Sequence, residues 1–93
     1  DFGDEEGMPR LSYFYGIAIY MYYGDHAPPH FHAIYGSDEA EVAIRSRRLL
    51  RGSLPIRALA LVREWARMNE RNLLAAWTGA QTGEPLRPVT PLK

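Results

Sequence analysis

The chain has 93 residues, of which 46% are hydrophobic, and its 11 basic and 11 acidic residues give a formal net charge of zero. This length fits one domain with a modest core and excludes a second sizeable domain. The absence of cysteine excludes a disulfide framework and a thiolate metal site. No apolar run approaches the roughly twenty residues that span a bilayer, so we expect a cytoplasmic protein without membrane contact.

The zero net charge conceals an asymmetry, because four of the acidic residues lie within residues 1–7, ahead of Met8-Pro9. We interpret residues 1–7 as a disordered leader, either a cloning remnant or an upstream extension. We expect a single domain over residues 8–83. The prolines that recur over residues 84–93 predict an extended tail.

Aromatic and β-branched residues without a helical period predict strands in the first half of the domain. Tyr15-Gly16 and Gly36-Ser37-Asp38 are typical of tight turns, whereas the adjacent Pro28 and Pro29 lack ladder donors and place residues 24–29 in a loop. We therefore predict an antiparallel meander of about five short strands. In chain order these begin at Leu11 and at Ile17 and then cover residues 30–35, 40–44 and 49–51.

Helical periodicity follows the predicted strands. Apolar residues recur at three-and-four spacing from Leu54 to Trp77, and Pro55 suits the first turn of a helix. Asn69 falls within this stripe, so it either interrupts one bent helix or caps a second helix that begins at Glu70; we favour a break or a bend there, which leaves open whether there is one helix or two. Packing the stripe on one sheet face gives a two-layer α+β fold.

All three histidines lie in the segment Asp25-His26-Ala27-Pro28-Pro29-His30-Phe31-His32. His30 and His32 are two apart on one predicted strand, so their side chains share a face that we expect to be exposed. His26 joins them only if a turn over residues 25–28 folds it back, because an extended path through the prolines would carry it about 12 Å away.

The histidines allow three readings that the sequence leaves open. His26, His30 and His32, with Asp25, could hold a zinc or nickel ion, although the spacing matches no standard zinc motif. His26, His30 or His32 could instead act as an acid or base without any cofactor. The third reading is structural, with the imidazoles satisfied by hydrogen bonds to the loop. No reaction, and not even enzymatic activity, follows from these residues.

Arginines and tyrosines near the histidines suggest partner contacts. A positive patch on the turn and strand after residue 44 could meet RNA phosphates or an acidic protein, and two tyrosines could share the histidine face. Glu39 and Glu41 on the neighbouring strand could neutralise part of this patch. The candidate contact residues are Arg45, Arg47, Arg48, Arg51, Tyr20 and Tyr22.

Several segments together resemble a known family: Phe14-Tyr15-Gly16-Ile17, the run from Met21 to Ala33 that contains the histidines, Gly52-Ser53-Leu54-Pro55, Trp65, and Leu73-Leu74-Ala75-Ala76-Trp77. These segments are similar to those of the domain of unknown function 4160 family of small bacterial proteins. The resemblance runs from about Met8 to Leu92. It marks Asp25, His26, Pro28, Pro29, His30 and His32 as the family's motif, with Trp65 and Trp77 as framework.

The resemblance carries no catalytic assignment. Because some members are labelled as toxin-antitoxin components, it implies a bacterial cytosolic protein that works with an antitoxin-like partner. Our first hypothesis is accordingly a toxin-antitoxin component that contacts RNA or a protein through its histidines and arginines. The alternatives are a metal-binding histidine module and a non-catalytic interaction domain, either of which could be a homodimer.

Overall fold

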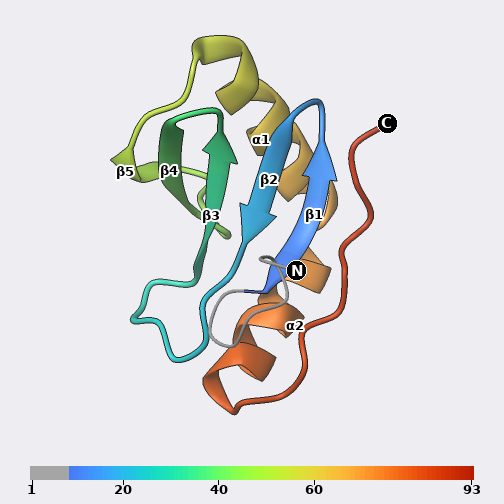
Figure 1. Ribbon diagram of the computed structural model, residues 1–93. Coiled ribbons are helices and arrows are strands. Elements are labelled where there is room, and N and C mark those ends of the chain that lie inside the picture. The colour runs from blue at the N-terminus through green and yellow to red at the C-terminus, as the bar shows by residue number, and fades with distance from the viewer. Residues whose placement is uncertain (1–8) are drawn as a thin grey trace.

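The computed structural model describes residues 9–93, and the predicted leader over residues 1–7 lies outside the described residues. Five antiparallel strands form one sheet in the order β1-β2-β3-β4-β5, and two helices follow (Figure 1). This confirms the predicted α+β meander. The elements are β1 (Arg10–Phe14), β2 (Ile17–Tyr20), β3 (His30–Tyr35), β4 (Asp38–Ala43), β5 (Leu49–Gly52), α1 (Ile56–Met68) and α2 (Glu70–Gln81).

Tight turns fix the register of the meander. The turn between β3 and β4 has Gly36 at a φ of +61°, a backbone conformation that glycine adopts without steric cost. This turn pairs Tyr35 of β3 with Asp38 of β4. The same register places His32 directly opposite Glu41. The turn chemistry therefore determines which carboxylates lie beside the histidines.

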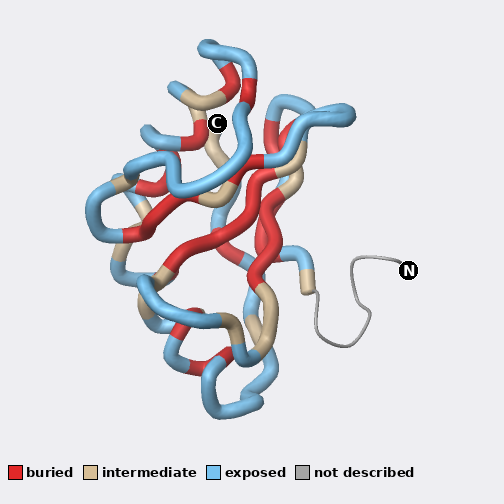
Figure 2. The backbone as a smooth tube through the Cα atoms, turned by 90° about the vertical axis from the view of Figure 1, so that its left-hand side faces the viewer, coloured by how far each residue is buried: buried red, intermediate tan, exposed pale blue. Residues whose placement is uncertain are grey.

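The core lies between the sheet and the helices. Alternation along β3 turns Phe31 and Ala33 toward α1, where the Phe31 ring meets the Trp65 indole edge-on at 5.5 Å between centroids. The alternate residues of the strand, His30 and His32, point to the opposite face of the sheet. Figure 2 shows the buried residues concentrated in the central strands. Among residues 9–93, no helix is both long and apolar enough to cross a membrane.

A break at Asn69 separates the two helices, which is one of the two alternatives that the sequence left open. The side chain of Asn69 does not cap α2; its Nδ2 donates to the carbonyl oxygen of Trp65 at 2.8 Å and so satisfies the last turn of α1. The change of direction places α2 beyond the end of the sheet where β3 begins (Figure 1). This position brings α2 next to the histidine segment.

The C-terminal segment runs as an extended chain along β1 (Figure 1). The backbone amide of Val89 donates to the carbonyl oxygen of Leu11 at 2.7 Å, and Val89 is buried in the core. The Nε1 of Trp65 donates to the carbonyl oxygen of Thr90, also at 2.7 Å. The segment therefore occupies the outer edge of β1 at Leu11 and completes the hydrogen bonding of a core indole.

Candidate metal centre

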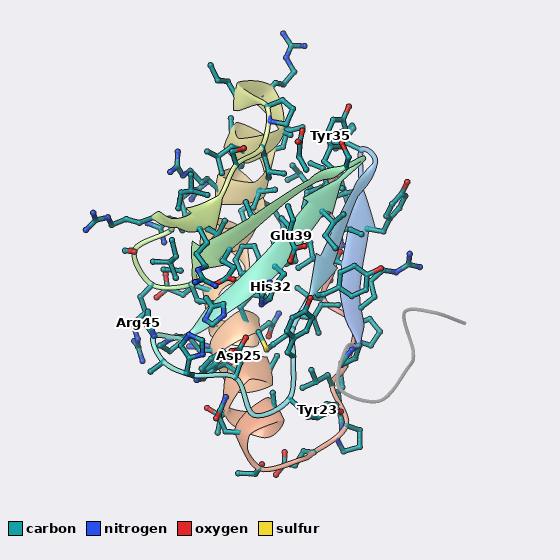
Figure 3. All side chains as sticks on the ribbon, turned by 60° about the vertical axis from the view of Figure 1, so that its left-hand side comes forward. Tyr23, Asp25, His32, Tyr35, Glu39 and Arg45 are labelled. Carbon is teal, nitrogen blue, oxygen red and sulfur yellow. The ribbon has the colours of Figure 1, made fainter. Side chains whose placement is uncertain are left out.

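The site is assembled from the start of β3 and the loop over residues 21–29. Two hydrogen bonds tie that loop to the end of α2. The backbone amide of Gly24 donates to the carbonyl oxygen of Ala80 at 3.2 Å, and the side-chain Nε2 of Gln81 donates to the backbone carbonyl oxygen of Asp25 at 3.0 Å. These two bonds hold the loop that carries Asp25 against the sheet. Figure 3 shows Asp25 at the end of the sheet, close to His32, with Glu39 farther along the same face.

Each of the two strand histidines has its Nδ1 atom engaged by an acceptor. The Nδ1 of His30 lies 2.7 Å from the carbonyl oxygen of Pro28, which can only accept, so Nδ1 carries the proton. The Nδ1 of His32 lies 3.2 Å from Oε2 of Glu39, a second acceptor. Both rings therefore turn Nε2 toward the inside of the site.

The two Nε2 atoms converge on one carboxylate oxygen. Oδ2 of Asp25 lies 3.0 Å from Nε2 of His30 and 3.3 Å from Nε2 of His32. The ligand atoms of these three side chains all lie within 4.8 Å of one another, as in a metal site. A tetrahedral zinc ion with bonds of 2.0–2.1 Å separates its ligand atoms by roughly 3.3 Å, which is close to the two distances from Oδ2 of Asp25 to the Nε2 atoms.

The carboxylate of Glu41 lies close enough to the cluster to serve as a fourth ligand. Oε1 of Glu41 lies 3.7 Å from Nε2 of His30, while Oε2 of the same carboxylate lies 3.9 Å from the guanidinium of Arg51. Glu41 is the cross-strand partner of both His32 and Arg51. A small movement of this carboxylate toward the histidines would complete a four-ligand set.

The histidine face is covered, contrary to the expectation of an exposed surface. His30 and His32 are only 2% and 4% exposed. The Tyr22 ring stacks on His32 at 4.1 Å between centroids, and the Trp77 indole of α2 lies 5.2 Å from His30. The cause is the path of the chain, because the loop over residues 21–29 folds back over the sheet and α2 closes its end. The imidazoles are thus held in fixed orientations.

His26 stays outside the cluster. Its side chain is 84% exposed, and its Nδ1 faces the other oxygen of Asp25, Oδ1, at 3.1 Å. Its backbone amide donates to the same oxygen at 2.9 Å. The predicted turn does bring the His26 ring to 5.9 Å from that of His30, but its contact with Asp25 makes it a support of the ligand and not a member of the set.

Two groups at the site have shifted pKa values. Burial acts to raise the pKa of Asp25, but the His26 amide, the His32 hydrogen bond and, when the rings are protonated, the charges of His30 and His32 together outweigh it, so the pKa lies below its ordinary value of 3.8. Burial raises the pKa of Tyr22, and the carboxylates of Glu39, Asp25 and Glu41 raise it further. Asp25 is therefore ionised, and Tyr22 is a neutral phenol, at neutral pH.

The lowered pKa of Asp25 predicts a pH dependence of stability. Because its folded-state pKa lies below the unfolded value, the carboxylate stabilises the fold above about pH 4, and that contribution disappears as the pH falls through the folded-state pKa. In chelator-treated protein, we expect the unfolding free energy to fall more steeply below pH 4 in the wild type than in Asp25→Asn. Urea titrations at several pH values measure this, and equal slopes would contradict it.

The structure separates the predicted contact residues into two groups. Arg47 bonds to Glu70 of α2 at 3.2 Å, and Arg51 lies by Glu41, so these two guanidinium groups have acidic neighbours. Arg45 and Arg48 line a pocket of about 550 Å³ beside Pro28 and Pro29. Tyr22 stacks on His32, and Tyr20 is the buried cross-strand partner of His32 on β2.

Sequence reasoning did not include Glu39 and Glu41 among the site residues. Their signal was present, because the two-residue turn after Tyr35 fixes the hairpin register and places Glu41 opposite His32. Glu39 lies two residues earlier on the same face of β4, within hydrogen-bonding distance of His32. Trp77 gave no such signal, since its approach to His30 depends on where α2 packs.

The comparisons with known proteins place the chain in a family. A family model described as a domain of unknown function (DUF4160) matches residues 16–78, which include all of the candidate metal centre. Among curated proteins and among solved structures, nothing matches. Since the model covers more than half of the chain, this protein belongs to the DUF4160 family.

Proposed function

We propose that this protein binds one divalent transition-metal ion, zinc or nickel, through Nε2 of His30, Nε2 of His32 and Oδ2 of Asp25. The observation that supports it is the convergence of these three atoms while both Nδ1 atoms face other acceptors. Neutral imidazoles with Nδ1 protonated present lone pairs at Nε2, and lone pairs that face a carboxylate repel unless a positive species lies between them. A metal ion supplies that charge.

The competing arrangement replaces the metal by protons. If each Nε2 carried a proton, both rings would be cations that donate to Asp25, at distances that also fit hydrogen bonds. Their centroids are 5.3 Å apart and both rings are buried, so the two cations would repel each other, and the carboxylates of Asp25, Glu39 and Glu41 would have to offset that repulsion. One ion bound to two neutral rings avoids this repulsion, and we therefore favour the metal.

The surroundings of the cluster also suit a metal. The carbonyl of Pro28 and the carboxylate of Glu39 accept from the Nδ1 atoms, which fixes the tautomers and raises the basicity of Nε2, as outer partners of metal-bound histidines commonly do. The ligand set of imidazole and carboxylate, without thiolate, is one that zinc and nickel both accept. Glu41 supplies the fourth ligand in this proposal.

A calorimetric titration tests the proposal. The protein is purified without a histidine tag, treated with chelator and titrated with zinc and then with nickel. We expect one ion per chain and a dissociation constant below about 1 µM. Protons that the two imidazoles carry on Nε2 in the metal-free protein should be released on binding. A chain that takes up neither zinc nor nickel at about 100 µM, at neutral pH, would contradict metal binding and leave the protonated network as the explanation.

We propose, as a second candidate function, contact with a partner through the arginines that face the histidine loop, within a toxin-antitoxin system as the family resemblance implies. The supporting observation is the pocket beside Pro28 and Pro29, where Arg45 and Arg48 lie with no acidic side chain among the lining residues. Co-expression with a neighbouring gene product that changes the solubility or toxicity of the protein would support this candidate. Loss of the effect in Arg45→Ala would connect it to the pocket.

A further inference from the structure

We propose that the outer edge of β5 binds an extended, acidic segment of a partner protein by strand addition. This inference names the class of partner for the second candidate function and does not depend on the metal centre. It rests on three features of the described residues: an open sheet edge, an apolar surface on that edge, and arginines without acidic neighbours beside it.

The two edges of the sheet differ in whether another segment of the chain pairs with them. The outer edge of β1 is covered by the C-terminal segment, through the bond from the amide of Val89 to the carbonyl of Leu11. Within residues 9–93, β5 pairs with β4 and no other segment pairs with its outer side. Figure 1 shows β5 at the margin of the sheet, away from the C-terminal segment. An edge of this kind is a template for an added strand.

The open edge also carries apolar side chains. All four residues of β5 are exposed, and Leu49 and Leu50 are 38% and 40% exposed despite their size. Both leucines line the pocket of about 550 Å³, together with Pro28, Pro29 and Ala43. A strand added to β5 would pair with its backbone and could place an apolar side chain in this pocket, which combines the two sources of affinity in strand addition.

The charge at this edge indicates an acidic partner. Arg45 and Arg48 line the pocket, and no acidic residue lines it, whereas Arg51 of β5 has a 75% exposed side chain but lies 3.9 Å from Glu41. Opposite charges on neighbouring strands stabilise pairing, so glutamate or aspartate on the added strand would be favoured. RNA is disfavoured as the occupant because no aromatic side chain lines the pocket to stack on bases.

One symmetric pairing of two copies of this chain along this edge is unfavourable. In the symmetric antiparallel register centred between Leu49 and Leu50, Arg48 of one copy would face Arg51 of the other. Like charges directly opposite each other destabilise strand pairing. In that register the arginines therefore disfavour pairing of two copies and favour a partner of opposite charge.

The test uses chelator-treated full-length protein and a short synthetic peptide in which glutamate alternates with valine. We expect micromolar binding, and amide shift changes in NMR spectra that concentrate on residues 48–52. A peptide with lysine in place of glutamate, and a peptide with alternate backbone amides methylated, should each bind about tenfold more weakly. The methylated peptide separates strand pairing from simple charge attraction.

Matched charge reversals locate the binding surface. Arg48→Glu should weaken binding of the acidic peptide about fivefold, whereas Arg87→Glu, an exposed position in the C-terminal segment, should leave it unchanged. Equal binding of the methylated peptide would overturn strand addition, and so would an absence of binding or shift changes away from β5. Tighter binding of an oligouridylate with the same dependence on Arg48 would assign the surface to RNA instead. Zinc binding is measured separately, so either proposal can fail alone.

Discussion

Replacing His32 by alanine should lower the zinc affinity of this protein at least about 100-fold, because it removes one of three converging ligands and leaves Oδ2 of Asp25 with a single imidazole partner. His30→Ala should have an effect of the same size. Both losses are measured by zinc titration of chelator-treated protein, with circular dichroism to establish that each variant is folded.

The chain supplies a matched control for these variants. His26 belongs to the same short segment, but its ring is exposed and faces the other carboxylate oxygen of Asp25. We expect His26→Ala to change the zinc affinity by no more than a factor of about three, since only the support of Asp25 is weakened. If His26→Ala weakened zinc binding as strongly as His32→Ala, the assigned ligand set would be wrong.

An intermediate loss of zinc affinity is expected for Glu39, which is hydrogen-bonded to the proposed ligand His32. Glu39 accepts from Nδ1 of His32 at 3.2 Å and does not belong to the cluster of converging ligand atoms. Its removal in Glu39→Ala frees the His32 ring to rotate and lowers the basicity of Nε2, for which losses of 10-fold to 100-fold are typical. Glu39→Ala should therefore lie between the His26 and His32 variants.

The largest effect on stability is expected at Trp65. The indole is fully buried, packs on Phe14 at 5.2 Å and on Phe31 at 5.5 Å, and donates to the carbonyl of Thr90. Trp65→Ala should lower the free energy of unfolding by about 3–5 kcal/mol, because it opens a cavity and removes the donor to Thr90. Urea denaturation followed by circular dichroism measures the loss.

Two further variants keep this prediction testable if Trp65→Ala does not fold. Trp65→Phe retains most of the ring but not Nε1, so it should cost less than Trp65→Ala while still leaving the carbonyl of Thr90 without its donor. Ile56→Ala, at a residue that is 90% exposed, should change stability by less than about 0.5 kcal/mol. Equal losses in Trp65→Phe and Ile56→Ala would contradict the role of the indole.

Local pattern was sufficient to predict most of the fold. Period-two alternation placed His30 and His32 on one face, and turn chemistry at Gly36 separated β3 from β4, because both depend on neighbouring residues. A break or a bend at Asn69 was also predicted, and the structure shows a break. The hydrogen bond that Asn69 makes there was not predicted. Whether its side-chain amide caps α2 or donates back to the carbonyl oxygen of Trp65 depends on the angle between the helices.

The enclosure of the site could not be predicted in the same way. The histidines are buried because Trp77, from a helix far along the chain, closes one side and Tyr22 stacks on another. Such contacts depend on where a helix packs and on the path of a loop, which single-sequence patterns do not encode. The converging Nε2 atoms likewise became visible only once the Nδ1 partners, Pro28 and Glu39, were located.

The most direct test of the metal centre is the state of the four imidazole nitrogens of His30 and His32, read from long-range nitrogen-proton NMR spectra during a zinc titration. We predict that both Nδ1 atoms keep their protons while both Nε2 signals shift to the range of metal-bound nitrogen, with saturation at one zinc per chain. Protons on all four nitrogens, unchanged by zinc at neutral pH, would contradict the metal centre.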